Sequence, residues 1–251
     1  MALLPTFAHD PAMPPTTNHL GQPIGDPVPG WRPCPRPPRT PMMGRTCRLE
    51  PLSAARHAAA LHEANLLDVD GRGWTYLPYG PFGSLDEYTA WMTSVESADD
   101  PVFYAIVDAR IDQPVGIASY LRIDPAMGNI EVGHLRYSPR LQRTVAATEA
   151  MYLMMERAFE ELGYRRYEWK CDALNAPSRA AAERLGFTYE GTFRQAIVMK
   201  GRNRDNAWFS ILDSEWPALR RAFETWLDPA NFDATGTQRR RLAARAEARD
   251  R

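Results

Sequence analysis

The sequence lacks the features that mark several common classes of protein. It has only three cysteines, Cys34, Cys47 and Cys171, and no CxxC pair, so neither a disulfide framework nor a metal site is expected. No stretch approaches the ~18 consecutive apolar residues of a membrane span, and the first residues do not resemble a signal peptide. A net charge of -1 gives no overall field that would gather nucleic acid or an anionic membrane. These absences predict a cytoplasmic protein with no nucleic-acid, membrane or metal partner.

Proline is abundant but unevenly distributed. More than half of the 22 prolines lie before residue 44, and proline disfavours helix both at its own position and at the preceding residue. Residues 1–44 are therefore expected to form an extended arm. The arm is either disordered or laid over the domain or a partner subunit through Leu20, Ile24, Val28 and Trp31. Residues 45–228 are expected to form one domain, and the arginine-rich residues 229–251 a solvated tail.

Between these ends, the hydrophobic periodicity predicts alternating elements. Strands are expected at 46–52, 102–107, 115–123, 129–137, 164–171, 187–199 and 206–212, and helices at 53–65, 84–95, 148–162, 178–185 and 216–226. The three strands from 102 to 137 are joined by short turns, which favours an antiparallel meander. A long helix separates strands 129–137 and 164–171, so this pair is expected to be parallel. The prediction is an α/β (α+β) fold with a mixed, mostly antiparallel sheet of six to seven strands flanked by helices.

The turn at residues 138–149 follows a strand directly and opens the long helix. The first amides of a helix have no intrahelical partner, and the helix dipole is positive at this end, so the turn suits a phosphate or pyrophosphate group. Arg140 and Arg143 add positive charge beside it. This is the first candidate binding site.

Two motifs then carry a resemblance to a known family. Residues 142–147 match the coenzyme A loop (Gln/Arg)-x-x-Gly-x-(Gly/Ala), and residues 175–178 with Leu185-Gly186-Phe187 match a second signature, Asn-x-x-Ser before a short helix. By these motifs the chain resembles the GNAT acyl-CoA N-acyltransferases over residues 45–227, within the branch typified by the ribosomal-protein alanine N-acetyltransferases RimJ and RimL. The resemblance implies the GNAT fold and acetyl-CoA as co-substrate. The residues it implies for binding coenzyme A are Leu135, Tyr137, Gln142, Arg143, Thr144, Val145, Ala146, Ala147, Thr148, Asn175 and Ser178.

The chain departs from the family pattern at two positions. Val145 stands where the loop usually has its first glycine, and its branched side chain comes where the backbone should approach the ligand. Ala182 stands where many members carry the tyrosine that protonates the leaving thiolate. In this interpretation Ser178, at the thiol end, takes over that role.

The acceptor amine must lose a proton, so a base is needed. Glu131 lies on the strand that leads to the loop, with a spacing similar to that of the catalytic glutamate in histone acetyltransferases of this superfamily; the alternative is a solvent-facing glutamate. His134 is the rival base, because an unperturbed histidine pKa of ~6.5 suits neutral pH. Their odd separation points the two side chains to opposite faces unless the strand contains a bulge.

An aromatic loop at residues 71–83 is the candidate acceptor site. Its rings either pack at the edge of the core or form one wall of an acceptor pocket; they are Trp74, Tyr76, Tyr79 and Phe82. The expected function is transfer of acetyl from acetyl-CoA to a primary amine, on a small molecule or a peptide N-terminus, by a protein that forms a homodimer. The alternative is a non-catalytic acyl-CoA-binding module, motivated by Val145 and Ala182.

Overall fold

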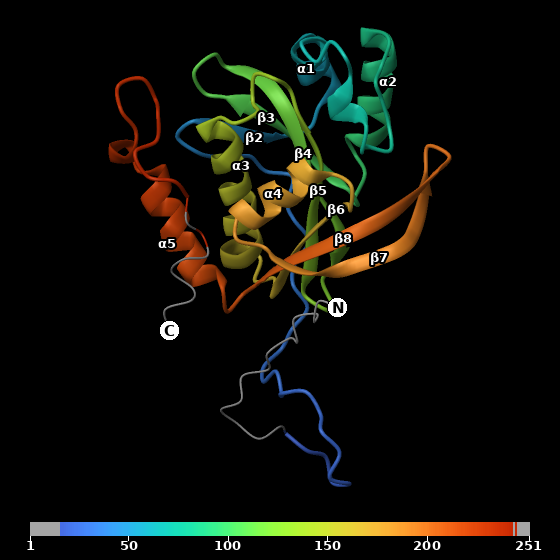
Figure 1. Ribbon diagram of the computed structural model, residues 1–251, viewed down its shortest axis with the longest axis vertical. Coiled ribbons are helices and arrows are strands. Elements are labelled where there is room, and N and C mark those ends of the chain that lie inside the picture. Colours follow the sequence, from blue (N-terminus) through green and yellow to red (C-terminus); the bar gives the residue numbers. More distant parts are fainter. Residues whose placement is uncertain (1–15, 243, 245–251) are drawn as a thin grey trace, which may run out of the picture. The chain divides into compact units, whose positions relative to one another are not determined.

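The computed structural model describes residues 16–242 and 244 (Figure 1), which form two compact units, one ending at Arg32 and the other starting at Pro33. In the first unit, the Asn18 side chain accepts hydrogen bonds from the amides of Leu20 and Gln22 and so closes a turn. Residues 1–15 of the expected arm and most of residues 243–251 of the tail lie outside the described residues. The division into arm, domain and tail stays a prediction.

The second unit contains all the helices and strands named in the figure. Its strands are β1 (Met42–Met43), β2 (Cys47–Pro51), β3 (Val102–Asp108), β4 (Gln113–Asp124), β5 (Asn129–Tyr137), β6 (Arg166–Asp172), β7 (Thr188–Met199) and β8 (Arg202–Leu212). Its α-helices are α1 (Ala54–Leu66), α2 (Leu85–Val95), α3 (Val145–Glu156), α4 (Ala176–Arg184) and α5 (Trp216–Leu227). Short helical turns, η1 (Arg72–Trp74), η2 (Arg157–Glu161) and η3 (Pro229–Asn231), complete the set.

The strands form a single sheet in the order β1-β2-β3-β4-β5-β6-β8-β7. The pairing is antiparallel throughout except between β5 and β6, which are parallel and joined through α3. The mixed, mostly antiparallel sheet and the parallel pair are therefore confirmed. The sheet has eight strands rather than six or seven because Met42–Met43 adds a short strand beside β2, too short to show a periodic pattern.

The two faces of the sheet carry separate cores. Side chains alternate along β4, so Ala118 and Tyr120 lie in the larger core with α3, α4 and α5, while Ile117 lies in the smaller core with α1 and α2. Figure 1 shows α3 and α4 in front of the central strands and α1 beside α2 at the other side of the unit. Across the described residues, no helix is both long and apolar enough to cross a membrane.

Several boundaries differ from the sequence prediction at positions where side chains cap helices. Helix α3 begins at Val145 rather than at Thr148, because the Thr144 hydroxyl accepts a hydrogen bond from the Ala147 amide at 3.1 Å and so caps the helix earlier. Ser84 caps α2 as expected and accepts from the Glu87 amide at 3.2 Å. Ser53 stands before α1 without a side-chain cap bond; its amide instead donates to His57 Nδ1.

Candidate active site

The parallel strands β5 and β6 separate halfway along their length. They pair only over residues 129–132 of β5 and 166–169 of β6, although β5 continues to Tyr137 and β6 to Asp172. The separation follows a β-bulge in β5: Ser119 of β4 pairs with Gly133 and Ile117 pairs with Arg136, so one β4 residue stands opposite two of β5. A bulge bends and twists its strand. The opening between β5 and β6 thus begins directly after Val132.

The bulge also decides where two candidate bases lie. His134 adopts a φ of 52°, in the left-handed region. Its ring stacks on Tyr79 and makes a tilted contact with Phe103 at the smaller core. Glu131 faces the same side, since its neighbours Ile130 and Val132 both point into the larger core. Glu131 and His134 therefore share one face of the sheet, which the simple alternation of a strand would not allow. An extra residue in a strand leaves no signal in hydrophobic periodicity, so the sequence could name this possibility but not choose it.

Glu131 is a buried carboxylate held by two cations. Its side chain lies 3.1 Å from Arg122 Nε and 3.6 Å from Lys170 Nζ, and only 2% of the residue is exposed. Its Oε2 atom makes no hydrogen bond of good geometry among the described residues. Burial raises the pKa of Glu131 to about 7, against the opposing effect of Lys170 and Arg122. The alternative of a solvent-facing glutamate is wrong.

His134 has the opposite electrostatic character. Burial, together with the positive charges of Lys170 and Arg204, lowers the pKa of His134 to about 4. The ring stacks on Tyr79 with 5.6 Å between centroids and 10° between planes. His134 is therefore neutral at pH 7 and a much weaker base than an unperturbed imidazole.

The loop at residues 138–144 joins the open end of β5 to α3. Its Leu141 side chain is fully buried against Gly116 of β4, where a Cβ atom would come within 2.6 Å of Leu141 Cδ2. Gln142 Nε2 donates to the Tyr137 carbonyl at 3.0 Å, and Thr144 Oγ1 donates to the Leu141 carbonyl at 2.7 Å. These contacts fix the loop without using the first amides of α3.

Those amides lie where the phosphate site is expected. Val145 and Ala146 are the first two helical residues, whose amides have no intrahelical partner. Val145 is tolerated because the left-handed conformation falls on Arg143, with a φ of 60°, and Val145 itself is helical. Arg143 is exposed beside this helix end, while Ala147 and Thr148 are buried. The residues present thus fit a pyrophosphate at the start of α3.

The second motif lies at the start of α4, which follows β6. Asn175 caps α4 through its side chain, which accepts from the Ser178 amide at 3.2 Å. The Ser178 hydroxyl accepts from Trp169 Nε1 at 3.0 Å, and Trp169 is the last β6 residue paired with β5. Ala182 is fully buried in the larger core. Ser178 therefore lies next to the point where the strands separate.

The aromatic loop divides into two parts. Trp74, Tyr79 and Phe82 contact one another with centroid distances of 5.6 to 6.4 Å, and Tyr79 also stacks on His134. Tyr76 is separate, and its hydroxyl donates to the Leu174 carbonyl at 3.2 Å, just before α4. The loop thus runs from the smaller core to the β6–α4 connection. Three of the four expected acceptor residues come together, and Tyr76 does not join them.

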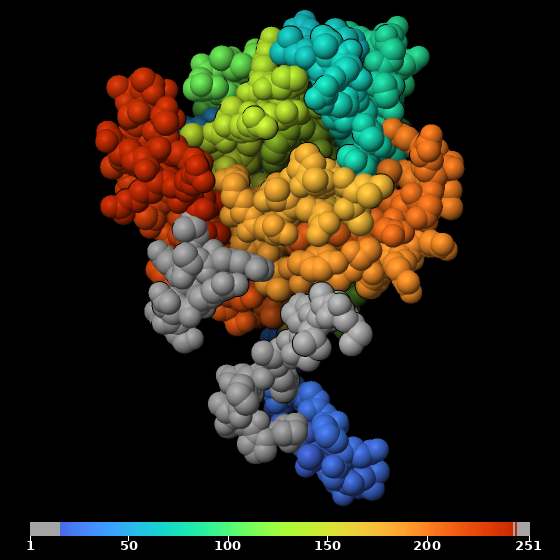
Figure 2. Space-filling model, viewed as in Figure 1, coloured from blue at the N-terminus to red at the C-terminus, as the bar shows by residue number. Residues whose placement is uncertain are grey.

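The hairpin of β7 and β8 holds this loop through its backbone. Lys200 Nζ donates to the carbonyls of Trp74 at 3.0 Å and Gly80 at 3.2 Å, and Arg204 Nη1 donates to the Tyr76 carbonyl at 3.3 Å. Figure 2 shows the orange hairpin reaching the cyan loop region on one face of the molecule. Sequence reasoning missed Lys200 and Arg204, because a lysine that binds backbone carbonyls has no partner visible in the sequence.

Comparison with known proteins decides the family. The family described as Acetyltransferase (GNAT) domain matches residues 47–188, more than half of the chain. The chain belongs to the GNAT acetyltransferases. This confirms the family expected from the loop and from the second motif, and the family implies acetyl-CoA as co-substrate and an amine as acceptor.

Two solved structures resemble this GNAT acetyltransferase along most of its length. A GCN5-related N-acetyltransferase from Brucella melitensis is 46% identical, with a TM-score of 0.84, covering 86% of this chain and 97% of that one. A probable acetyltransferase of the GNAT family from Chromobacterium violaceum is 43% identical, with a TM-score of 0.72, covering 82% and 100%. Among curated proteins, the putative ribosomal N-acetyltransferase YdaF of Bacillus subtilis is 30% identical over 101 residues, 40% of this chain. The chain spans only 55% of the length of that relative.

Proposed function

We propose that this GNAT acetyltransferase moves the acetyl group of acetyl-CoA directly to a primary amine, with Glu131 as the proton acceptor. The observation that carries the proposal is the combination at β5: a buried carboxylate with a pKa of about 7 stands directly before the point where β5 leaves β6. A base is most effective when its pKa lies near the working pH. Glu131 meets this condition and His134, with a pKa of about 4, does not.

The proposed step balances without a covalent enzyme intermediate. The amine nitrogen bonds to the acetyl carbon, the carbon–sulfur bond breaks, and Glu131 accepts the proton that the amine gives up. The leaving thiolate takes a proton from the Ser178 hydroxyl, which recovers one from solvent water. Ser178 accepts from Trp169 Nε1 and lies within hydrogen-bond reach of the Cys171 thiol, so its proton turns from that sulfur to the thiolate. His134 serves in the wall of the acceptor site, stacked on Tyr79.

In this proposal acetyl-CoA binds in the opening between β5 and β6. The amides of Val145 and Ala146 bind the pyrophosphate, with Gln142, Arg143, Thr144, Ala147 and Thr148 forming the rest of the loop. Backbone groups of Leu135 and Tyr137, which lie beyond the last pair with β6, face the pantetheine together with Asn175. The role of these residues in binding coenzyme A stays a prediction. Coenzyme A supplies the activated acetyl group as a thioester.

The acceptor is either a small amine or a protein N-terminus. The aromatic wall of Trp74, Tyr79 and Phe82, fixed by Lys200, supports an enclosed site for a small amine or a short peptide end. The name of the YdaF relative, a putative ribosomal N-acetyltransferase, supports an acceptor amine on a ribosomal component.

The alternative proposal is a module that binds acyl-CoA without catalysis, supported by Ala182, which places a methyl group where many members have an acidic hydroxyl. One experiment separates the two proposals. The purified protein is incubated with acetyl-CoA and a panel of small amines and N-terminal peptides while free thiol is followed. Enzymatic function predicts thiol release above the hydrolysis background with at least one acceptor. Calorimetric binding of acetyl-CoA without any acceptor-dependent thiol release favours the binding module, and no binding of acetyl-CoA contradicts both.

We also infer a cytoplasmic homodimer. The three cysteines are free and buried, which suits a reducing compartment. The edge strand β7 exposes Phe193 and Val198, at 60% and 80%, which suits association. Light scattering coupled to size exclusion tests the dimer: a mass near 28.4 kDa at micromolar concentration would contradict it.

A further inference from the structure

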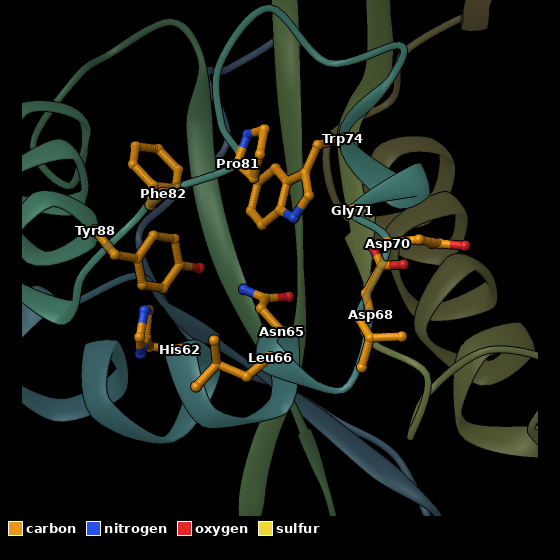
Figure 3. Close-up of a pocket in the computed structure, with 11 residues that line it drawn as sticks. His62, Asn65, Leu66, Asp68, Asp70, Gly71, Trp74, Pro81, Phe82 and Tyr88 are labelled. Carbon is orange, nitrogen blue, oxygen red and sulfur yellow. The ribbon is translucent and has the colours of Figure 1, made fainter.

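A cavity lies beside the aromatic loop, apart from the opening between β5 and β6. It has a volume of about 290 Å³, is partly open to solvent and is lined by the end of α1, the loop and the start of α2 (Figure 3). For comparison, a cavity of roughly 150 Å³ is enough to bind benzene. The space therefore accommodates one ring with substituents.

The chemistry of the walls selects the kind of ring. Trp74, Phe82 and Tyr88 present aromatic side chains, and the Phe82 ring centroid lies 5.6 Å from Trp74 and 5.2 Å from Tyr88. Aromatic rings that meet at such distances favour further offset or edge-to-face contacts. A flat ring in the cavity gains such contacts with the sides of these rings that line it.

In the described part of the chain, the Tyr88 hydroxyl, a buried polar group of the cavity wall, has only the Asn65 side chain as a neighbouring partner. The Tyr88 side chain is 1% exposed, and its hydroxyl makes no hydrogen bond of good geometry among the described residues, although Asn65 stands beside it. Figure 3 shows this hydroxyl and the Asn65 carboxamide pointing into the cavity. The His62 Nε2 atom on the same wall has no partner among these residues. Because a buried polar atom without a hydrogen bond is costly, these atoms indicate a bound group with oxygen.

The charged side chains at the rim of the cavity form ion pairs. Asp68 pairs with Arg136 Nη2 at 3.0 Å, and Asp70 pairs with Arg72. The guanidinium of Arg136 also lies over the Trp74 ring, 4.4 Å from its centroid. No carboxylate of the lining is left to neutralise a cation, so the walls suit an uncharged ligand.

We propose that this cavity is a binding site for a small uncharged aromatic molecule with a hydroxyl group, of the phenol class. The ring packs against Trp74, Phe82 and Tyr88, and its oxygen hydrogen-bonds to the Tyr88 hydroxyl and the Asn65 carboxamide. The cavity shares Trp74 and Phe82 with the proposed acceptor wall, whereas Tyr79 and His134 do not line it, nor do the residues of the proposed coenzyme A loop.

The test is calorimetric titration of the full-length protein with phenol, in the absence of acetyl-CoA, so its result does not depend on the proposed acetyl transfer. Saturable binding is expected, with toluene and cyclohexanol binding about fivefold or more weakly, since each lacks either the oxygen or the planar ring. Absence of saturable phenol binding overturns the proposal.

Two variants locate the ligand. Leu66→Trp fills the mouth of the cavity from a residue that is 60% exposed and is expected to abolish binding. Leu67→Trp, at a neighbouring exposed residue outside the lining, is the matched control and should bind as the unaltered protein does. Tyr88→Phe should weaken phenol about fivefold but leave toluene unchanged. Thermal melting checks that each variant is folded. Unchanged phenol affinity in folded Leu66→Trp, or in folded Tyr88→Phe, contradicts the assigned site.

Discussion

Two glutamates of this protein are almost equally buried but have different roles. Glu149 of α3, 5% exposed, receives hydrogen bonds from the amides of Arg45, Thr46 and Cys47 at 2.9, 2.6 and 3.0 Å, and from the Thr46 hydroxyl. Glu131 of β5, 2% exposed, has two ion pairs, with Arg122 and Lys170, both through its Oε2 atom. Both side chains are buried, so the two glutamates differ in the number of hydrogen-bond donors around each carboxylate.

The carboxylate of Glu149 has a structural role, and that of Glu131 is suited to a chemical one. The donors around Glu149 satisfy its charge and fasten the start of α3 to the turn before β2, next to the expected pyrophosphate site. Around Glu131 few donors offset the cost of burial, and its pKa rises to about 7. A carboxylate left in this condition can exchange a proton near neutral pH.

The largest effect is expected from Glu131→Gln, with an acceptor identified by thiol release. Removing a general base lowers turnover by roughly 10²- to 10⁴-fold, while acetyl-CoA affinity should stay nearly unchanged because Glu131 lies outside the loop. Steady-state rates and calorimetry measure the two quantities. An undiminished rate would remove Glu131 from the mechanism.

Glu149→Ala should cost stability instead. It leaves three amides and a hydroxyl without their acceptor, at a cost of about 3 kcal/mol in the free energy of unfolding. For a chain of this size the melting temperature should fall by roughly 6 to 12 °C. Calorimetric melting measures this. A melting temperature equal to that of the unaltered protein would show that the carboxylate does not fasten α3.

The free energy of unfolding should depend on pH through Glu131. The folded pKa of Glu131 is raised, so between the unfolded pKa of about 4.3 and the folded pKa of about 7 the folded protein binds more protons than the unfolded chain. Glu131 therefore lowers stability progressively as pH rises through this window, by an amount on the order of 3 kcal/mol. Urea unfolding at pH 5.5 and 8 measures the change. Glu131→Gln should be the more stable protein at pH 8; a variant less stable at that pH would contradict the raised pKa.

The smallest effect is expected at the hairpin. Lys200→Met removes the donor to the Trp74 and Gly80 carbonyls. The KM for the acceptor should rise roughly three- to tenfold, which is the effect of losing about one hydrogen bond. The affinity for acetyl-CoA should not change. Arg202→Met, in the same hairpin but with no hydrogen bond to the aromatic loop among the described contacts, is the matched control. Equal KM values in the two variants would show that the lysine does not position the loop.

The sequence predicted the parts of this fold that depend on local pattern. The limits of β5 and the parallel pair are as expected, whereas α3 and α4 begin three and two residues earlier than expected. It did not predict partners far apart along the chain: Lys170 beside Glu131, Lys200 beside Trp74, and the turn at residues 45–47 around Glu149. A charged residue in a sequence carries no mark of its partner, and the bulge at His134 changes the face of a side chain without changing the pattern.

The pKa of Glu131 decides whether this residue can act as the base, and its measurement needs no acceptor. Carbon-13 NMR of protein labelled at the glutamate carboxyl carbons follows each carboxyl through a pH titration, and the resonance that disappears in Glu131→Gln is assigned to this residue. The account predicts a midpoint near pH 7. A midpoint near 4.3, the value of an unperturbed glutamate, would contradict it.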